Sequence, residues 1–341
     1  MLYHITCNTD NNYAQHCCAM LCSLFENNKD MSFHVHVLTN ALSINNEGEI
    51  KQLCSRYNAC LTIHEVDESR LEGVKFRKRR PLTKAAYYRT LLPEIIDKSI
   101  DNILYLDCDM IVVGSVSELF EIELDNYALA ATKDCMPFNS EHRKQLHFES
   151  DERSFCSGIM MVNLKYWREH NSTEALLEYS RRERGEIFLH DQDALNYVFK
   201  KQWFLLPPKW NKPAQSYMPD VNDISYFDVY EYVHEPRIIH FSGDAKPWFN
   251  IKFPYSRVYR KFLVQSKYSS PVFIKIPLPE RVCFEFMIIK YFIRKYIMPF
   301  IPNIVLLLIK DIIKIFTSIY SIFNKNRFHN YLVKEGINAI K

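Results

Sequence analysis

The chain has 341 residues, 48% hydrophobic and 24% charged, with only 7 glycines, which excludes collagen-like, low-complexity and intrinsically disordered classes. That length suits one catalytic domain of about 250 residues with an appendage. The net charge of +3 is unevenly distributed, since residues 281–341 hold 10 Lys and Arg against 3 Asp and Glu. This distribution argues against a uniformly basic nucleic-acid-binding protein.

The first part of the chain alternates strand-like and helical patterns. Apolar runs typical of strands occur at Tyr3–Cys7, Ser32–Leu38 and Cys60–Val66, and helical patterns at His16–Phe25 and Glu47–Tyr57 separate them. This alternation predicts βαβ units and therefore an α/β fold with a mostly parallel sheet flanked by helices.

The next predicted strand leads directly to a pair of acids. Lys84–Leu92 is helical in pattern, and the apolar strand Asn102–Leu106 runs into Asp107-Cys108-Asp109. Ligands of open α/β sheets bind beyond the carboxyl ends of strands, so we expect chemistry here. Further elements are predicted after it, as strands at Tyr127–Thr132, Ser157–Asn163 and Arg237–Phe241 and a helix at Gln192–Lys200.

Asp107 and Asp109 form an Asp-x-Asp (DxD) pattern that suits a divalent cation. Two carboxylates at a strand end offer the hard oxygen ligands that Mn²⁺ or Mg²⁺ prefers, and the cation then bridges the diphosphate of a nucleotide. An isolated Asp-x-Asp is more often an ordinary turn. The buried strand before the pair and the apolar stretch after it favour the metal site.

Six separated motifs give the chain a family resemblance. In order they are NTDNNYA, KAAYYRTLLPEII, LYLDCDMIV, SFCSGIMMVNLKYWRE, HDQDALN and IIHFSGDAKPW. With these motifs, residues 1–262 resemble glycosyltransferase family 8, the retaining galactosyl- and glucosyltransferases of bacterial lipopolysaccharide and capsule synthesis. The resemblance implies a GT-A-type, Rossmann-like fold with a mixed, mostly parallel sheet. It also implies transfer of a hexose, galactose or glucose, from a UDP-sugar with a divalent metal.

The resemblance also assigns roles to individual residues. It implies that the metal is held by Asp107, Asp109 and His240. The residues implied to contact the nucleotide and its diphosphate are Asn8, Asp10, Asn12, Tyr13, Asp107, Cys108, Gly243 and Lys246, with Tyr13 stacked on the base. Those implied to contact the donor sugar are Arg89, Ser157, Gly158, Asp191 and Gln192.

Catalysis is implied for Arg89, Asp191, Gln192 and Lys246, with Lys246 neutralising the β-phosphate as it leaves. The acid near the anomeric carbon is left open between Asp191 and Asp193, either of which could instead cap the helix that begins there. Double displacement and a front-face route therefore both stay possible.

One residue departs from the family pattern. Cys156 stands where the family usually has Asn, so the amide that would hydrogen-bond a sugar hydroxyl is missing and the donor sugar is not predicted. The ten cysteines are scattered among apolar residues, and we expect them, Cys156 included, to be reduced and buried.

The C-terminal part has a different character. We expect a catalytic domain over residues 1–268 and a basic, helical, membrane-associated tail over 269–341. The uncharged stretch 296–309 is shorter than the roughly 20 residues of a spanning helix and contains two prolines. The polar residues of 303–324 recur at three- to four-residue spacing, which predicts an amphipathic helix lying on an anionic membrane surface. Packing on the catalytic domain or on a second copy is the alternative.

These features predict a location and a set of partners. The N-terminus lacks a signal-peptide pattern, so we expect a cytoplasmic protein attached peripherally to the inner face of the plasma membrane. Its partners would be a nucleotide-sugar donor and a lipid-linked, glycolipid or polysaccharide acceptor. Two other classes fit the residues less well, a nucleotide-sugar-binding protein with weak catalysis and a metal-dependent nucleotidyltransferase.

Overall fold

The structure is a computed structural model that describes residues 1–76, 84–135, 138–149, 152–182, 187–215, 225–243, 246–249 and 253–278. The predicted tail helix over 303–324 lies outside the described residues. Within them, no helix is long and apolar enough to cross a membrane.

Ten strands carry the fold in the described part of the chain. They are β1 (Leu2–Asn8), β2 (Ser32–Thr39), β3 (Cys60–Glu65), β4 (Asn102–Leu106), β5 (Met110–Val112), β6 (Leu129–Lys133), β7 (Phe155–Asn163), β8 (Trp203–Leu206), β9 (Lys212–Pro213) and β10 (Ile238–His240). All the strands expected from the sequence are present within two residues of their predicted ends.

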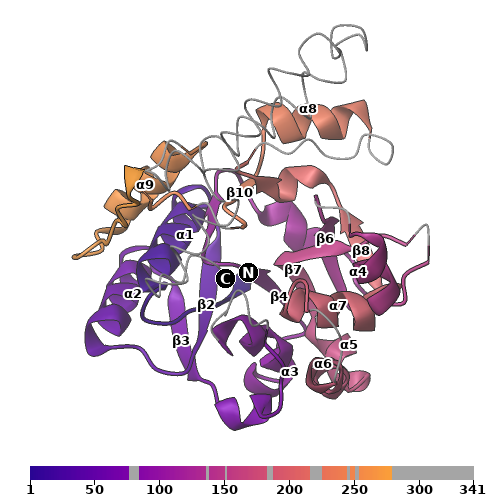
Figure 1. Cartoon of the computed structure of the whole chain (residues 1–341). Helices are drawn as coiled ribbons and strands as arrows, with labels where there is room; N and C mark the ends of the chain where they lie inside the picture. The colour runs from indigo at the N-terminus through magenta and orange to yellow at the C-terminus, as the bar shows by residue number, and fades with distance from the viewer. Residues whose placement is uncertain are drawn as a thin grey trace, which may run out of the picture.

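Helices connect and cover these strands (Figure 1). The α-helices are α1 (Ala14–Glu26), α2 (Ile44–Arg56), α3 (Leu92–Ile95), α4 (Ser140–Gln145), α5 (Leu164–Glu169), α6 (Ser172–Arg181), α7 (Asp191–Phe199), α8 (Tyr226–His234) and α9 (Ser256–Ser266). The 3₁₀ helices are η1 (Glu68–Leu71), η2 (Lys84–Leu91), η3 (Ser117–Glu121) and η4 (Pro208–Trp210). The helix predicted at Lys84–Leu92 is thus mostly a 3₁₀ helix.

Seven strands form the main sheet in the order β3-β2-β1-β4-β7-β6-β8. The pairs β2–β3, β1–β2, β1–β4 and β6–β8 are parallel, whereas β7 runs antiparallel to both β4 and β6. The sheet is therefore mixed and mostly parallel, as the sequence predicts. A second sheet of order β5-β10-β9 stands beside it.

Side chains alternate between the two faces of the main sheet, so a hydrophobic core forms on each face. Along β4, Leu104 and Leu106 join the core beneath α1 and α9, while Ile103 and Tyr105 join the core on the opposite face. The second core includes residues of η2 and the helices α5 to α7. Strand β4 is consequently buried on both faces up to Leu106, the residue before Asp107.

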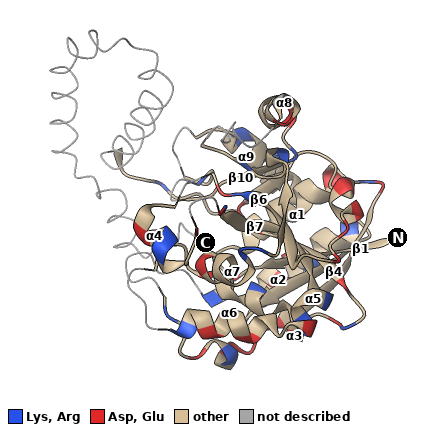
Figure 2. Ribbon diagram, turned by 90° about the vertical axis from the view of Figure 1, so that its right-hand side faces the viewer, with Lys and Arg blue, Asp and Glu red and all other residues tan. Residues whose placement is uncertain are grey.

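The segment after α9 packs on the main body of the fold. Val272 exchanges hydrogen bonds with the Gln15 side chain at 2.7 and 3.0 Å, the Ile274 N–H donates to the Trp248 carbonyl at 3.0 Å, and Ile276 is buried. These contacts extend the packed segment to Ile276, and the division of the chain into a catalytic domain and a tail stays a prediction. Figure 2 shows acidic and basic residues mixed over the outer helices, with both signs on α4 and α6.

Candidate active site

The two acids of the Asp-x-Asp pattern sit at the junction of the two sheets. Residues 107–109 connect β4 of the main sheet to β5 of the small one. Strand β10 runs antiparallel to β5 with His240 opposite Met110, and the Phe241 N–H donates to the Asp109 carbonyl at 2.9 Å. Strand pairing therefore brings His240 to the acids across about 130 residues of sequence.

Asp107, Asp109 and His240 form a compact buried cluster. Their ligand atoms lie within 4.8 Å of one another, with His240 Nε2 3.4 Å from Asp109 Oδ1 and 4.0 Å from Asp107 Oδ2. Each of the three side chains is buried. The geometry thus brings together the three residues predicted as metal ligands.

The surroundings fix the orientation of the His240 ring. Asn211 Nδ2 donates to Thr132 Oγ1 at 2.9 Å, so its Oδ1 is left to accept from His240 Nδ1 at 3.0 Å. The Nε2 lone pair of neutral His240 then faces two carboxylates, which is unfavourable unless a cation or a proton lies between them. Burial by itself would lower the pKa of His240, but Asp109 raises it to about 10. This donor set suits a divalent cation in place of that proton.

Lys246 is the second cationic group beside Asp109. Its ammonium is fully buried, 2.6 Å from Asp109 Oδ2, and also donates to the Phe241 carbonyl at 2.8 Å. Burial alone would raise the pKa of Asp109, but the charges of Lys246 and His240 hold it well below the ordinary value. The lysine predicted to meet a phosphate is therefore paired with a carboxylate here.

Arg89 links the Asp-x-Asp pair to helix α7. Its buried guanidinium donates to Asp107 Oδ1 at 2.8 Å and to the Ser157 carbonyl at 2.6 Å. Its Nε lies 3.1 Å from Asp191 Oδ2, and its Cζ lies over the Tyr105 ring, 4.2 Å from the ring centroid. One arginine therefore pairs with two buried carboxylates and is also held against an aromatic ring.

Helix α7 presents its first residues to the same site. His190, just before the helix, has a φ of 55°, a left-handed conformation that costs energy in a non-glycine residue and sets the direction of the helix start. Gln192 is held between two groups: its Nε2 donates to Asp134 at 2.6 Å, and its Oε1 accepts from the Ser157 N–H at 3.0 Å.

The contacts of Asp191 and Asp193, which the sequence left as alternatives, are different. Both oxygens of Asp193 are engaged, one by His142 at 2.7 Å and the other by the N–H groups of Phe188 and Leu189 at 3.1 Å. Asp193 therefore holds the turn before α7. Asp191 is buried beside Arg89, and burial raises its pKa to about 6 in spite of that positive charge.

The loop after β1 approaches the site from the other side. Asn8 is buried and donates to the Ala85 carbonyl at 2.9 Å, and Asp10 accepts from the N–H groups of Asn12 and Tyr13 at the start of α1. Tyr13 is 3% exposed, and its phenol has a pKa raised by burial and by the charge of Asp109. Asn12 is exposed.

The aromatic surroundings of Tyr13 bear on its predicted role. Its ring makes edge contacts with His16 and Trp248, which themselves stack at 3.5 Å between centroids. Stacking of Tyr13 on a nucleotide base stays a prediction. The Cys108 thiol, by contrast, is buried in the core and donates to the Asn8 carbonyl, so a ligand contact by this residue would use its backbone.

Two glycines have specific steric roles. A Cβ on Gly158 would lie 2.5 Å from His240 Cε1 and 3.1 Å from Asp107 Oδ2, so only glycine leaves room for the cluster. Gly243 has a φ of +80°, which disfavours any side chain there. Cys156 is half-buried and lies beside His240, where it contributes to the raised pKa of the imidazole, so it is not the plain core residue expected.

Sequence reasoning missed four supporting residues. Tyr105 donates to Asp107 Oδ1 at 2.8 Å, and it could have been found because residues two apart on a strand share a face. Thr132, Asn211 and Asp134 carry no sequence signal, since each acts only through a contact with a distant segment.

Comparisons with known proteins agree with this geometry. Residues 4–252 match the profile of the family described as Glycosyl transferase family 8. The chain is 31% identical over 279 residues to General stress protein A of Bacillus subtilis (strain 168), covering 79% of this chain and 96% of that protein. It is 26% identical over 260 residues to a Lipopolysaccharide 1,2-glucosyltransferase of Escherichia coli, covering 72% of this chain and 73% of that protein.

The fold is shared with solved structures. The galactosyltransferase LgtC, crystallised with donor and acceptor sugar analogs, superposes with a TM-score of 0.69 over 83% of this chain and 99% of that one, at 24% identity. This likeness shows the same GT-A-type architecture.

The raised pKa of Asp191 predicts a pH-dependent stability difference. Its folded-state pKa of about 6 exceeds the ordinary value, so the folded chain binds more protons than the unfolded chain between these values, and stability is lost as pH rises through that window. Asp191→Asn cannot ionise. The difference between its free energy of unfolding and that of the wild type should therefore shift in favour of the variant by up to about 3 kcal/mol as pH rises from about 4 to about 7. Urea denaturation at both pH values measures this, and a stability gap that does not change with pH would contradict it.

The tight packing at Gly158 predicts a loss of metal binding on substitution. Gly158→Ala should push His240 and Asp107 apart and weaken Mn²⁺ binding by about tenfold or more, because a metal site tolerates little displacement of its ligands. Gly48→Ala is the matched control, since a Cβ there meets nothing within 4 Å. Electron paramagnetic resonance of free Mn²⁺ gives the affinities, and equal affinities for the two variants would show that His240 and Asp107 do not form the site.

Proposed function

This chain belongs to glycosyl transferase family 8 and is a hexosyltransferase, and we propose that it transfers galactose or glucose from a UDP-sugar to a glycan or glycolipid acceptor with retention of configuration. The observation that carries the proposal is the buried cluster of Asp107, Asp109 and His240 with Lys246 beside it. Family membership argues against the nucleotidyltransferase alternative.

The residues of the cluster have separate tasks in the proposed reaction. Asp107, Asp109 and His240 would hold Mn²⁺ or Mg²⁺, which supplies the positive charge that stabilises the departing nucleoside diphosphate. Arg89 occupies Oδ1 of Asp107, so Oδ2 is the oxygen left to the cation. Lys246 would exchange its contact with Asp109 for one with the β-phosphate.

The donor sugar would lie against the start of α7. Gln192 is fixed by Asp134 and Ser157 and is half-buried, so its amide is placed to bind a sugar hydroxyl without moving. Asp191 is the carboxylate left for sugar contact, because both oxygens of Asp193 already accept hydrogen bonds from His142 and two backbone amides. Cys156 in place of the usual Asn would alter which hydroxyl pattern is recognised.

The nucleotide would be held by the loop after β1. The loop is held at the start of α1 by hydrogen bonds from the Asn12 and Tyr13 N–H groups to Asp10. It lies near Asp109, since the charge of Asp109 raises the pKa of the Tyr13 phenol. Gly243 would let the backbone approach the diphosphate next to Lys246. The acceptor would be a polysaccharide or a lipid-linked glycan, and the Escherichia coli relative is named for lipopolysaccharide.

The proposal predicts donor hydrolysis that depends on a metal. A panel of UDP-sugars incubated with Mn²⁺ should include one from which UDP is released, and excess EDTA should abolish the release. Asp107→Asn should lower this turnover by about 10²-fold or more, while Arg89 keeps a counter-charge in Asp191 and the fold persists. Exposed Asp30→Asn is the control. Undiminished turnover in EDTA would overturn the metal's role, and absence of turnover with every donor would favour a binding protein.

We also propose that the tail binds the inner face of the plasma membrane. Each Lys or Arg near an anionic surface contributes about 1 kcal/mol, and residues 281–341 have a basic excess. The chain should therefore sediment with anionic vesicles, more weakly at high salt. A chain ending at Leu278 should stay in the supernatant and keep donor hydrolysis, because it retains the contacts of Val272 and Ile274. Equal sedimentation of both chains would show that the tail packs elsewhere.

A further inference from the structure

Four histidines form a row across the first three strands of the main sheet. His4 lies on β1, His34 and His36 on β2, and His64 on β3. In the strand register His4 is opposite His34, and His34 and His36 are two residues apart, so their side chains share one face. We refer to these four residues as the histidine row.

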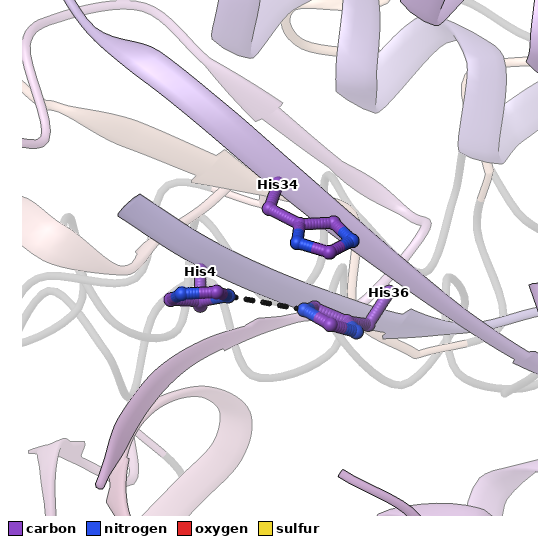
Figure 3. A group of neighbouring side chains, drawn as sticks. All are labelled: His4, His34 and His36. Carbon is purple, nitrogen blue, oxygen red and sulfur yellow. Dashed lines mark hydrogen bonds between the residues drawn. The ribbon is translucent and has the colours of Figure 1, made fainter. Parts of the chain in front are cut away.

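The rings of the histidine row are close enough to share an ion. His4 Nδ1 lies 3.1 Å from His36 Nε2, and His36 Nδ1 lies 3.0 Å from His64 Nε2. The rings of His34 and His36 stack at 4.2 Å, and the ligand nitrogens of His4, His34 and His36 all lie within 4.8 Å of one another. Figure 3 shows His4 and His36 directed toward each other, with His34 beside them.

The row has no counter-charge in the part of the chain that the structure describes. No carboxylate there forms an ion pair with any of the four histidines. Burial, followed by the neighbouring histidines, lowers the pKa of His36 to about 3, and burial also lowers the pKa values of His4, His34 and His64. The imidazoles are therefore neutral and keep their lone pairs at physiological pH.

From this geometry we propose that His4, His34 and His36 bind a late first-row transition-metal ion such as Zn²⁺, at a site separate from the catalytic cluster. Imidazole nitrogens suit zinc, nickel, copper and cobalt, whereas the carboxylate-rich cluster of Asp107 and Asp109 suits manganese and magnesium. The two sites differ in ligand chemistry as well as in residues.

The nitrogens that would not bind the metal already have partners. His34 Nε2 is 2.8 Å from Thr62 Oγ1, which leaves Nδ1 for the ion. His36 Nδ1 is held by His64, which leaves Nε2 facing His4. Such contacts fix the tautomer and orientation of metal-binding histidines, and here both come from β3. His64 is thus a positioning residue for the proposed site.

The nitrogens of His4 and His36 are already separated by nearly the distance that the ion needs. Nitrogens bound to one tetrahedral Zn²⁺ at about 2.05 Å are about 3.3 Å apart. His4 and His36 are at 3.1 Å around a shared proton, so the ion would replace that proton with a widening of a few tenths of an ångström and a turn of both rings toward the ion. The His34 nitrogen, within 4.8 Å of the other two, would move closer to complete the site. Three protein ligands would leave a position for water. The ion would join β1 to β2 near the start of both strands.

Cobalt absorption spectroscopy on the full-length chain tests the proposal. Addition of Co²⁺ alone should give visible d–d bands with stoichiometric saturation, and Zn²⁺ should remove them by competition. His36→Asn should abolish the bands, and half-buried His4→Asn provides a second variant should the buried substitution prevent folding. His64→Asn should keep the bands but weaken Co²⁺ affinity by about 10- to 100-fold, as loss of a positioning contact does.

Three control variants separate the site from other ligands. His147→Asn changes an exposed histidine outside the row, at a φ of 56° that asparagine tolerates. Cys60→Ser removes the exposed thiol opposite His34 in the sheet. Asp107→Asn impairs the catalytic cluster. All three should keep the bands. The proposal would be overturned if the bands never form or if they survive in both His36→Asn and His4→Asn. Loss of the bands in Asp107→Asn or Cys60→Ser would also overturn it.

Discussion

The burial of three carboxylates at one edge of the sheet is the constraint on which the rest of the site depends. Asp107, Asp109 and Asp191 are each nearly inaccessible to solvent, and buried charge is costly unless it is paired. Arg89 meets Asp107 and Asp191, and Lys246 meets Asp109. Two cations do not balance three carboxylates, and the remaining negative charge faces His240. A divalent cation would be stabilised between His240 and the acids.

The two sheets divide this task. The main sheet delivers the acids, since β4 is buried on both faces and Asp107 follows directly after its last residue, Leu106. The small sheet delivers the predicted metal ligand His240 and the positive charge of Lys246, because β10 pairs with β5 and its following loop carries Lys246 back to Asp109. The strand pairing thus supplies the precise placement that a metal site requires, and the side chains need little adjustment.

The surrounding residues restrict motion of the groups proposed to act on substrate. Arg89 is held by Ser157 and Tyr105, His240 by Asn211, and Gln192 by Asp134. Groups fixed in this way lose little conformational freedom when a ligand binds. Lys246 differs from them, because a phosphate would have to compete with Asp109 for its ammonium, and a cation on Asp109 would favour that exchange.

The sequence by itself predicted seven of the ten described strands in their order along the chain and the α/β class, because hydrophobic periodicity is a local property. Its family motifs predicted Asp107, Asp109 and His240 as metal ligands. It left Asp191 and Asp193 equivalent, since both stand at a helix start. The tertiary structure separated them, because His142 and two N–H groups engage Asp193 while Arg89 faces Asp191. Asn211, Asp134 and the histidine row likewise exist only through pairing between distant strands and loops, and no local pattern records which residues such pairing places side by side.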